Sequence, residues 1–259
     1  MKKFGLIGHP IAHSLSPALF KAGYDGRYPY ELIETDDFEE AYSRFLNEYD
    51  GINVTAPFKE LAYAKADILS EECRNTGAAN LLIKTSEGTK AFNSDYLGVR
   101  MWLSGVREKM KSPHSTDQPV MVLVVGLGGA GKAAAAAAES LGMEVIRMNR
   151  TIKDSGTSPL SDFREYFRKA DIIIYNIPTV IEELKELTDS DFTSGRQKFI
   201  LEANYRNPSF DQTFTDRMKT VNPSAEYTGG KTWLLYQAVT GYEIFTGEKP
   251  DLSKMSSVL

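Results

Sequence analysis

The fold of this chain is decided by the stretch VMVLVVGLGGAGKAAAAAA, residues 120–138. Residues 120–125 are a short apolar run that predicts a strand, and the alanines after the glycines predict a helix. A G-x-G-x-x-G loop that joins a strand to a helix is the fingerprint of a dinucleotide-binding site. The alternative is a glycine-rich turn that binds nothing, and the full strand–loop–helix context speaks against it.

Each glycine of this loop has a mechanical task. Gly126 lets the chain turn, Gly128 lets the backbone approach a pyrophosphate, and Gly131 lets the helix pack closely on the strand. The N-terminus of the helix offers free N–H groups and a partial positive charge to phosphates. We therefore expect the dinucleotide to contact Gly126, Gly128, Gly129, Ala130 and Gly131.

The end of the next predicted strand indicates which dinucleotide is bound. A site for NAD normally has a carboxylate there, which accepts hydrogen bonds from the ribose hydroxyls. This chain has Asn149, Arg150 and Thr151 instead. Because a guanidinium can pair with a 2′-phosphate, we expect NADP with Arg150 as the main phosphate contact. A solvated loop arginine is the alternative.

The second half of the chain alternates between strands and helices. Apolar runs predict strands at 120–125, 144–148, 171–175 and 199–202. Strands of this kind suit a parallel sheet that is covered on both faces. The sequence therefore predicts a Rossmann-type, doubly wound α/β domain, followed by an amphipathic helix at 233–245.

The first hundred residues have an α/β rhythm of their own, which predicts a second domain. Residue patterns predict strands at 4–8, 28–34, 51–54, 79–84 and 89–92, and helices at 16–24, 38–49, after Pro57 and at 95–110. A polar stretch with two prolines, 111–119, is typical of a connector. The domain boundary should lie in that stretch or in the helix before it.

Composition excludes several classes of protein. The chain has 259 residues, of which 25% are charged, and a formal net charge of −5. Nucleic-acid binders usually carry a basic patch, and anionic membranes attract polybasic segments, so we expect neither partner. The single cysteine, Cys73, cannot form an internal disulfide. Because no segment has the length and apolarity of a membrane span or a signal peptide, we expect a soluble cytoplasmic protein.

Two residues of the first half have local contexts that leave their roles open. Lys59 should lie in the first helical turn after Pro57, where the positive end of the helix dipole disfavours a cation. That position suits a group that gives and takes a proton, and a solvated surface lysine is an equal alternative. Asp95 could act with Lys59, or it could merely cap the helix that follows.

Seven segments, taken in order along the chain, resemble shikimate dehydrogenases. They are SLSP (14–17), NVTAPFK (53–59), GAAN (77–80), NSD (93–95), the glycine loop, NRT (149–151), and Gly229-Gly230 with Gln237. The resemblance spans about residues 4–247, and seven ordered motifs are far more specific than a glycine loop alone.

The resemblance implies a role for each matching residue. Lys59 and Asp95 match the family's catalytic lysine and the aspartate paired with it. Substrate contacts are implied for Ser14 and Ser16 at the carboxylate, for Thr55, Asn80 and Gln237 at the ring hydroxyls, and for Tyr205 near the carboxylate. Further cofactor contacts are implied for Asn149, Thr151, Ile177 and Gly229. The last helix would return to the first domain, which implies a substrate-binding domain at 1–100 plus 232–259 and a dinucleotide-binding domain at 101–231.

The implied activity is the reversible, NADP-dependent reduction of 3-dehydroshikimate to shikimate in the biosynthesis of chorismate and the aromatic amino acids. Lys59 would protonate the carbonyl oxygen while NADPH delivers a hydride to the carbon, and no metal is needed. The sequence leaves open whether Lys59 or Asp95 carries the proton. One alternative is a quinate or other cyclitol-acid dehydrogenase that uses NAD. Another is a sensor that binds NADP or shikimate without turnover.

Four residues depart from the usual pattern of the family. They are Ile177 for threonine, Glu202 for aspartate, Thr232 for glycine and Trp233 for methionine. Because Ile177 and Trp233 would lie near the nicotinamide, we expect an active enzyme with an altered pocket wall. We expect a small-molecule substrate, no metal, and a monomer or homodimer.

Overall fold

The computed structural model describes residues 1–110, 119–152, 154–192 and 197–259. Its internal contacts divide the chain into two units, Met1–Gly98 with Leu235–Leu259, and Val99–Leu234. The chain passes from one unit to the other inside two helices, α5 (Ser94–Met110) and α10 (Gly230–Thr246). The connector predicted at 111–119 lies outside the described residues except for its last residue. The ranges 1–100 plus 232–259 and 101–231 stay a prediction for the domains as independent folding units.

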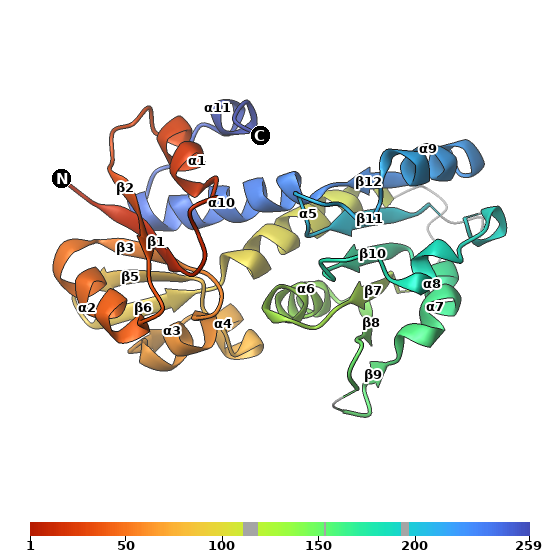
Figure 1. Cartoon of the computed structure of the whole chain (residues 1–259), viewed down its shortest axis with the longest axis horizontal. Coiled ribbons are helices and arrows are strands. Elements are labelled where there is room, and N and C mark those ends of the chain that lie inside the picture. Colours follow the sequence, from red (N-terminus) through yellow and green to blue (C-terminus); the bar gives the residue numbers. More distant parts are fainter. Residues whose placement is uncertain (111–118, 153, 193–196) are drawn as a thin grey trace. The chain divides into compact units, whose positions relative to one another are not determined.

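The first unit is built on a mixed sheet in the order β2-β1-β3-β5-β6-β4 (Figure 1). Its strands are β1 (Phe4–Gly8), β2 (Tyr30–Glu34), β3 (Gly51–Val54), β4 (Ile68–Leu69), β5 (Leu81–Thr85) and β6 (Gly88–Phe92). β1 pairs in parallel with β2 and β3, whereas β5 runs antiparallel to β3 and β6. The sequence did not predict β4, because two residues are too few to show an alternation.

Helices cover both faces of this sheet. On one face lie α2 (Phe38–Glu48), α3 (Lys59–Lys65) and α4 (Glu71–Thr76), and the apolar stripe of α2, Phe38, Tyr42 and Phe45, is buried there. On the other face lie α1 (Ser16–Gly23) and α10, where the rings of Phe4 and Phe245 stack 5.0 Å apart. The last helix, α11 (Leu252–Ser256), packs on α1.

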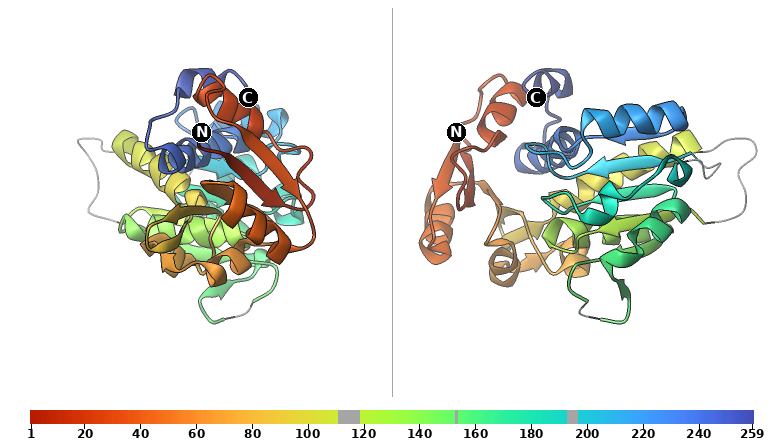
Figure 2. Two further views of the ribbon diagram at one scale, coloured as in Figure 1. Left: turned by 90° about the vertical axis from the view of Figure 1, so that its left-hand side faces the viewer. Right: turned by 45° about the vertical axis from the view of Figure 1, so that its right-hand side comes forward.

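The second unit contains a fully parallel sheet in the order β12-β11-β10-β7-β8-β9, which can be followed in Figures 1 and 2. Its strands are β7 (Met121–Val125), β8 (Glu144–Met148), β9 (Thr157–Ser158), β10 (Ile172–Tyr175), β11 (Phe199–Glu202) and β12 (Glu226–Thr228). The strand order reverses between β7 and β10, which is the topological switch point where doubly wound sheets bind ligands. The predicted Rossmann-type α/β fold is confirmed.

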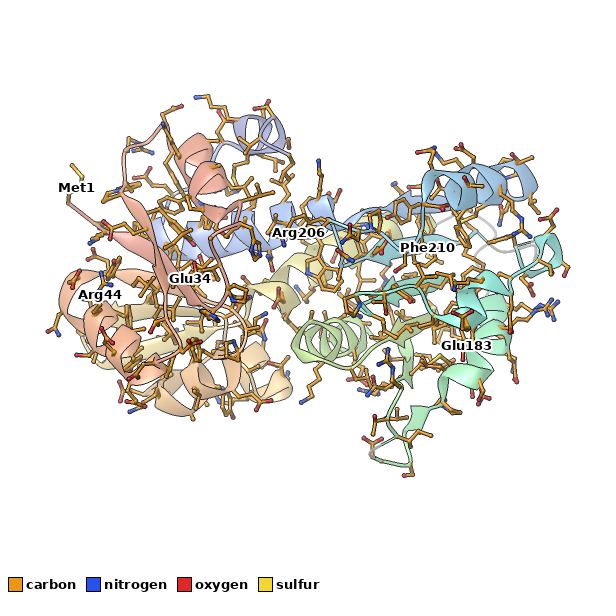
Figure 3. All side chains as sticks on the ribbon, viewed as in Figure 1. Met1, Glu34, Arg44, Glu183, Arg206 and Phe210 are labelled. Atoms are coloured by element: carbon orange, nitrogen blue, oxygen red, sulfur yellow. The ribbon has the colours of Figure 1, made fainter. Side chains whose placement is uncertain are left out.

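Alternate residues of these strands pack on opposite faces. Leu123 and Ile173 point into a hydrophobic cluster with α7 (Phe163–Lys169), α8 (Glu182–Lys185) and α9 (Gln212–Val221). Phe210, labelled in Figure 3, lies in this cluster with 2% of its surface exposed. The alanine-rich helix α6 (Gly129–Ser140) lies against β7 and β8. Among the described residues, no helix combines the length and apolarity that crossing a bilayer requires.

The start of α10 differs from the prediction. The helix begins at Gly230, three residues before the predicted start at 233. A Cβ on Gly230 would lie 2.5 Å from the carbonyl oxygen of Ala203, so only glycine lets the helix begin this close to the segment after β11. Gly230, a residue type that usually interrupts helices, is therefore the first residue of α10.

Candidate active site

Lys59 and Asp95 form an ion pair within the first unit. The distance from Lys59 Nζ to Asp95 Oδ2 is 2.5 Å. Lys59 is the first residue of α3, and Asp95 is the second residue of α5. The side chain of Asp95 is 7% exposed and that of Lys59 is 23% exposed, so the pair is largely shielded while the ammonium keeps contact with solvent. A positioned pair of this kind can exchange a proton with a bound group.

Asn93, and not Asp95, caps α5. Asn93 Oδ1 accepts a hydrogen bond from Tyr96 N at 3.2 Å, which is the bond that an N-cap side chain makes. Its Nδ2 donates to Thr76 Oγ1 and Ala78 O, both at 3.1 Å. The alternative that Asp95 merely caps the helix is therefore wrong. Because Asn93 supplies the cap, the carboxylate of Asp95 is left for Lys59.

The two residues Ala79 and Asn80 hold the backbone on both sides of this ion pair. Ala79 N donates to the carbonyl oxygen of Lys59 at 3.0 Å. Asn80 Oδ1 accepts from Ser94 N at 2.7 Å, next to Asp95. This bond fixes the orientation of the Asn80 amide. Within the described part of the chain its Nδ2 has no acceptor, so the amide can donate to a ligand.

The other predicted substrate residues of the first unit come from three elements. Ser14 Oγ donates to Ser16 Oγ at 3.2 Å at the start of α1, and both hydroxyls are half-buried. Thr55 directly follows β3, and Gln237 lies in α10. A Cβ on Gly98 would lie 2.6 Å from Gln237 N, so α5 and α10 cross at close range at this residue. The first unit thus contains the ion pair of Lys59 and Asp95 and every predicted substrate residue except Tyr205.

The glycine loop of the second unit has the geometry that a dinucleotide requires. Gly126 has a φ of +88°, which only glycine adopts readily. A Cβ on Gly131 would lie 1.8 Å from the carbonyl oxygen of Gly126, so any side chain there would push α6 away from the loop. Among the residues that the structure describes, a Cβ on Gly128 would meet no atom within 4 Å, and no side chain caps α6. The helix N-terminus is therefore open to an anion at Gly128, Gly129 and Ala130.

The three residues after β8 lie beside this loop. Asn149 Oδ1 accepts from Leu127 N at 3.4 Å, and its Nδ2 donates to Thr151 O at 3.1 Å. Asn149 therefore braces the glycine loop with its side chain. Arg150 is exposed, and across residues 1–110, 119–152, 154–192 and 197–259 no carboxylate pairs with it. Its guanidinium is available for a phosphate.

Ile177 packs under the glycine loop. The residue is 7% exposed and belongs to the hydrophobic cluster of the second unit. A Cβ on Gly126 would lie 2.9 Å from Ile177 Cγ1, so the loop and this side chain are in direct contact. The neighbouring Asn176 Oδ1 is buried without a hydrogen-bond donor among the described residues. Trp233, the other departure near the expected nicotinamide position, is 5% exposed.

Glu202 shapes the segment that carries Tyr205. Its carboxylate is fully buried and accepts hydrogen bonds from Ser209 N at 2.5 Å and from Tyr227 Oη at 2.7 Å. Asn204 Nδ2 donates to Pro178 O at 3.1 Å and so joins the segments after β10 and β11. Burial raises the pKa of Tyr205 above its ordinary value. Glu202 thus acts on the shape of this segment and contacts its backbone directly.

The contacts of His9 and the burial of Cys73 give neither residue a catalytic role. His9 lies 3.5 Å from Asp36 and 3.9 Å from Glu34 through its two ring nitrogens, at the end of β1. Cys73 is buried, and burial raises the pKa of its thiol to about 12, so it is not an active nucleophile. In the described ranges no three histidine, cysteine or acidic side chains come together as a metal site would require.

Family models match two parts of the chain. Residues 6–82 match the shikimate dehydrogenase substrate binding domain. Residues 79–201 match the NAD binding domain of D-isomer specific 2-hydroxyacid dehydrogenases. The two matches correspond to the substrate-binding and the dinucleotide-binding parts of the predicted site.

Known proteins are similar over nearly the whole length. A shikimate dehydrogenase (NADP(+)) of Cereibacter sphaeroides is 30% identical over 270 residues, covering 96% of this chain and 93% of the relative. The crystal structure of a shikimate 5-dehydrogenase from Thermus thermophilus in complex with NADP(H) and shikimate has a TM-score of 0.78 at 26% identity, covering 100% of this chain and 98% of that one. A quinate dehydrogenase from Corynebacterium glutamicum in complex with NAD has a TM-score of 0.80 at 22% identity, covers 99% of this chain and 98% of that one, and shares the fold alone. This chain belongs to the shikimate dehydrogenase family.

Proposed function

We propose that this protein is an NADP-dependent shikimate dehydrogenase that reversibly reduces 3-dehydroshikimate to shikimate, on the route to chorismate and the aromatic amino acids. The observation that carries the proposal is the shielded ion pair of Lys59 and Asp95, joined at 2.5 Å. Relatives named shikimate dehydrogenase (NADP(+)) support the substrate and the cofactor. The enzyme would act on a small molecule in the cytoplasm as a monomer or homodimer, without nucleic acid, membrane or metal.

The first unit would bind the substrate. Ser14 and Ser16 offer two adjacent hydroxyls, which suit a carboxylate because a hydroxyl can donate to a carboxylate oxygen. Asn80 offers an amide N–H group whose orientation is fixed by Ser94 N. Thr55 and Gln237 add polar groups that suit the ring hydroxyls. Tyr205 of the second unit is proposed for the carboxylate end.

Lys59 would transfer the proton of the reaction. Reduction of a ketone leaves negative charge on the oxygen, and the ammonium of Lys59 can give that oxygen a proton. Asp95 holds Nζ at 2.5 Å and so fixes the position of the donor. Because the side chain of Lys59 is 23% exposed, water can return the proton after each turnover. In the reverse direction the same amine takes the proton from the alcohol.

The second unit would bind NADP. The open position at Gly128, the uncapped start of α6 and the exposed Arg150 fit a pyrophosphate and a 2′-phosphate. Gly126, Gly129, Ala130 and Gly131 form the rest of the loop, and Asn149, Thr151, Ile177 and Gly229 complete the proposed contacts. The chemistry that the bound dinucleotide supplies is a hydride for the carbonyl carbon. These residues bind and orient the cofactor.

The ion pair also supports an enzyme over a sensor of NADP or shikimate. A sensor needs no proton donor, whereas Lys59 and Asp95 form an ion pair whose neighbouring backbone is fixed by Ala79 N at the carbonyl of Lys59 and by Asn80 Oδ1 at Ser94 N. The exposed guanidinium of Arg150 supports NADP over NAD. Neither observation favours a quinate dehydrogenase that uses NAD.

The test follows the absorbance of the reduced cofactor with 3-dehydroshikimate, using NADPH and NADH in parallel. The reverse reaction compares shikimate with quinate at equal concentrations. We expect rapid oxidation of NADPH, slow oxidation of NADH, and a clear preference for shikimate. Binding of NADPH without any oxidation would instead identify a sensor. Faster turnover of quinate with NAD would identify the cyclitol-acid paralogue.

A further inference from the structure

Two tyrosines of the first unit, the buried Tyr242 and the half-buried Tyr30, form hydrogen bonds near the proposed substrate residues. Tyr242, on α10, is 2% exposed, and its hydroxyl donates to the carbonyl oxygen of Ser16 at 3.0 Å. Tyr30, on β2, donates its hydroxyl to Asn53 Oδ1 at 2.8 Å. The two rings are 6.0 Å apart in a T-shaped arrangement. Tyr242 therefore contacts a proposed substrate residue, and Tyr30 contacts Asn53, two residues before Thr55.

In each of these contacts the phenol is the hydrogen-bond donor. Burial raises the pKa of both phenols, so both are protonated at neutral pH. A phenol donates only one hydrogen bond, and Tyr30 and Tyr242 donate theirs to Asn53 and to the carbonyl of Ser16. The Ser16 hydroxyl accepts from Ser14 Oγ at 3.2 Å, while the Ser16 carbonyl accepts from Tyr242. Ser16 is thus held by its hydroxyl and by its carbonyl.

The contact through Asn53 continues to the catalytic pair. Asn53 Nδ2 donates to Asn80 O at 3.3 Å. Asn80 Oδ1 in turn accepts from Ser94 N at 2.7 Å, next to Asp95. Hydrogen bonds therefore run from Tyr242 to Ser16, and from Tyr30 through Asn53 and Asn80 to Ser94, the neighbour of Asp95. The contact between the two phenol rings joins these two parts.

We propose that Tyr30 and Tyr242 are positioning residues that set the separation between the serine pair and the Asn80–Asp95 end of the site, and so determine affinity for a substrate with a carboxylate and ring hydroxyls. The proposal rests on the proposed function, because it assigns these phenols to that site. Neither phenol touches the catalytic pair. Their loss should therefore weaken substrate binding and leave the chemical step nearly unchanged.

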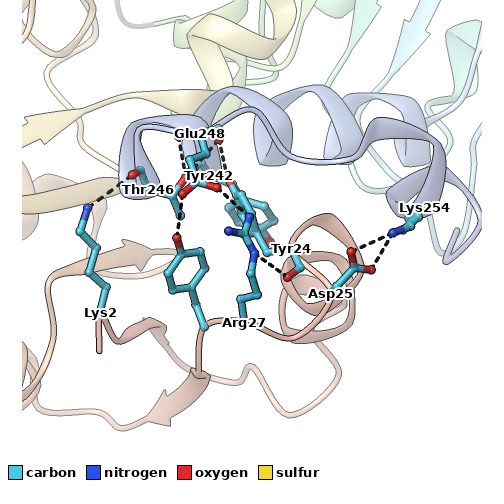
Figure 4. Close-up of polar contacts among 9 residues, drawn as sticks. Lys2, Tyr24, Asp25, Arg27, Tyr242, Thr246, Glu248 and Lys254 are labelled. Atoms are coloured by element: carbon cyan, nitrogen blue, oxygen red, sulfur yellow. Dashed lines mark hydrogen bonds and ion pairs between the residues drawn. The ribbon is translucent and has the colours of Figure 1, made fainter.

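Tyr24 is a matched control in the same aromatic cluster. It is 2% exposed, as Tyr242 is, and both rings pack on Phe20, at 5.1 Å and 4.7 Å between centroids. Its hydroxyl donates to the carbonyl oxygen of Glu248 at 2.9 Å, in the network that joins α1 to the C-terminal segment (Figure 4). Its hydroxyl also accepts from Thr246 Oγ1 at 2.9 Å, and in the described part of the chain it has no hydrogen bond to a proposed substrate residue. A purely structural role would make the three tyrosines equivalent.

The experiment compares Tyr242→Phe, Tyr30→Phe and Tyr24→Phe in the full-length protein. The measurements are the thermal midpoint, the dissociation constant of NADPH from its fluorescence, and kcat and KM for shikimate. A fourth measurement repeats the kinetics with a shikimate analogue that lacks the carboxylate. For Tyr242→Phe we expect KM for shikimate to rise about tenfold, with kcat within about twofold and NADPH binding unchanged.

The other two variants should differ from Tyr242→Phe in their KM for shikimate. Tyr30→Phe should raise KM for shikimate about threefold to fivefold, because Asn80 keeps its bond to Ser94. Tyr24→Phe should lower the thermal midpoint as much as Tyr242→Phe does and leave KM unchanged. With the carboxylate-free analogue, the loss in Tyr242→Phe should shrink to less than about threefold.

Two results would overturn the proposal, and they can be told apart from failure of the proposed function. If wild type oxidises shikimate and both Tyr242→Phe and Tyr30→Phe keep its KM, the phenols have no positioning role. If KM rises equally in all three variants in step with the thermal midpoint, the effect is structural. If wild type neither binds nor oxidises shikimate, the proposed function fails and the positioning role fails with it.

Discussion

In the second unit the proposed binding surface is made of backbone, whereas in the first unit it is made of side chains. The glycine loop works through a φ of +88° at Gly126 and through the missing Cβ atoms of Gly128 and Gly131. The proposed catalytic pair depends on two contacts between residues that are far apart in the sequence, from Lys59 to Asp95 and from Asn80 to Ser94. A backbone site can be predicted from one short motif, and a side-chain site depends on which residues the fold brings together.

The largest effect on NADPH binding should come from substituting two glycines of the loop, Gly131 and Gly128, whose surroundings differ. Gly131→Ala places a Cβ 1.8 Å from Gly126 O, so we expect loss of NADPH binding together with a large fall in the thermal midpoint. Gly128→Ala meets no protein atom within 4 Å, so the thermal midpoint should stay unchanged while NADPH affinity falls about tenfold or more.

Fluorescence titration with NADPH and a thermal melt of both variants provide the measurements. If Gly128→Ala bound NADPH as tightly as wild type, the backbone at this position would not face the pyrophosphate. The second unit would then not bind the dinucleotide through its backbone, as the comparison with the first unit assumes.

The next effect tests Arg150, the side chain proposed to contact the 2′-phosphate. Arg150→Ala should weaken NADPH binding about tenfold to a hundredfold and leave NADH binding unchanged, because only NADPH carries the 2′-phosphate. Arg147→Ala is the matched control, since Arg147 lies on β8 and pairs with Glu139. Equal losses for NADPH and NADH in Arg150→Ala would contradict the assignment of this residue.

The smallest effect on activity should come from substituting Asn93, which caps the helix that carries Asp95. Asn93→Ala removes the cap of α5 and two hydrogen bonds, so we expect a loss of about 1–3 kcal/mol in the free energy of unfolding and a fall of a few fold in kcat. Asp37→Ala removes a comparable cap from α2, where Asp37 accepts from Glu40 N. Its kcat should not change. Urea unfolding and steady-state kinetics would detect the difference, and equal kcat values in the two variants would deny Asn93 a role in placing Asp95.

The sequence predicts most of the fold because most elements carry a local signal. The strands β8 and β11 have the predicted limits, since polar residues mark their ends, Asn149 after β8 and Glu202 in β11. The short strands β4, β9 and β12 lack such runs and form only because a neighbouring strand offers hydrogen bonds. The early start of α10 at Gly230 depends on the position of Ala203, which no local pattern contains.

The residues of the candidate site likewise differ in whether the local sequence could predict them. The glycine loop follows from its own residues, and Lys59 was assigned only through the resemblance. In the run Asn93-Ser94-Asp95 all three residue types can cap a helix, so local reasoning cannot choose Asn93. Tyr30 and Tyr242 have the pattern of core aromatics, and only the contacts to Asn53 and Ser16 connect them with the site.

The most direct test of the account is the turnover number of Lys59→Ala for the reduction of 3-dehydroshikimate by NADPH. Lys65→Ala, at the other end of α3, is the control, because its ammonium is exposed and pairs with Glu39 at 2.7 Å. The account predicts that kcat falls about a hundredfold or more in Lys59→Ala, with NADPH binding unchanged, and stays at the wild-type value in Lys65→Ala. A folded Lys59→Ala variant that binds NADPH and keeps kcat within about threefold of wild type would contradict the role of the ion pair in proton transfer.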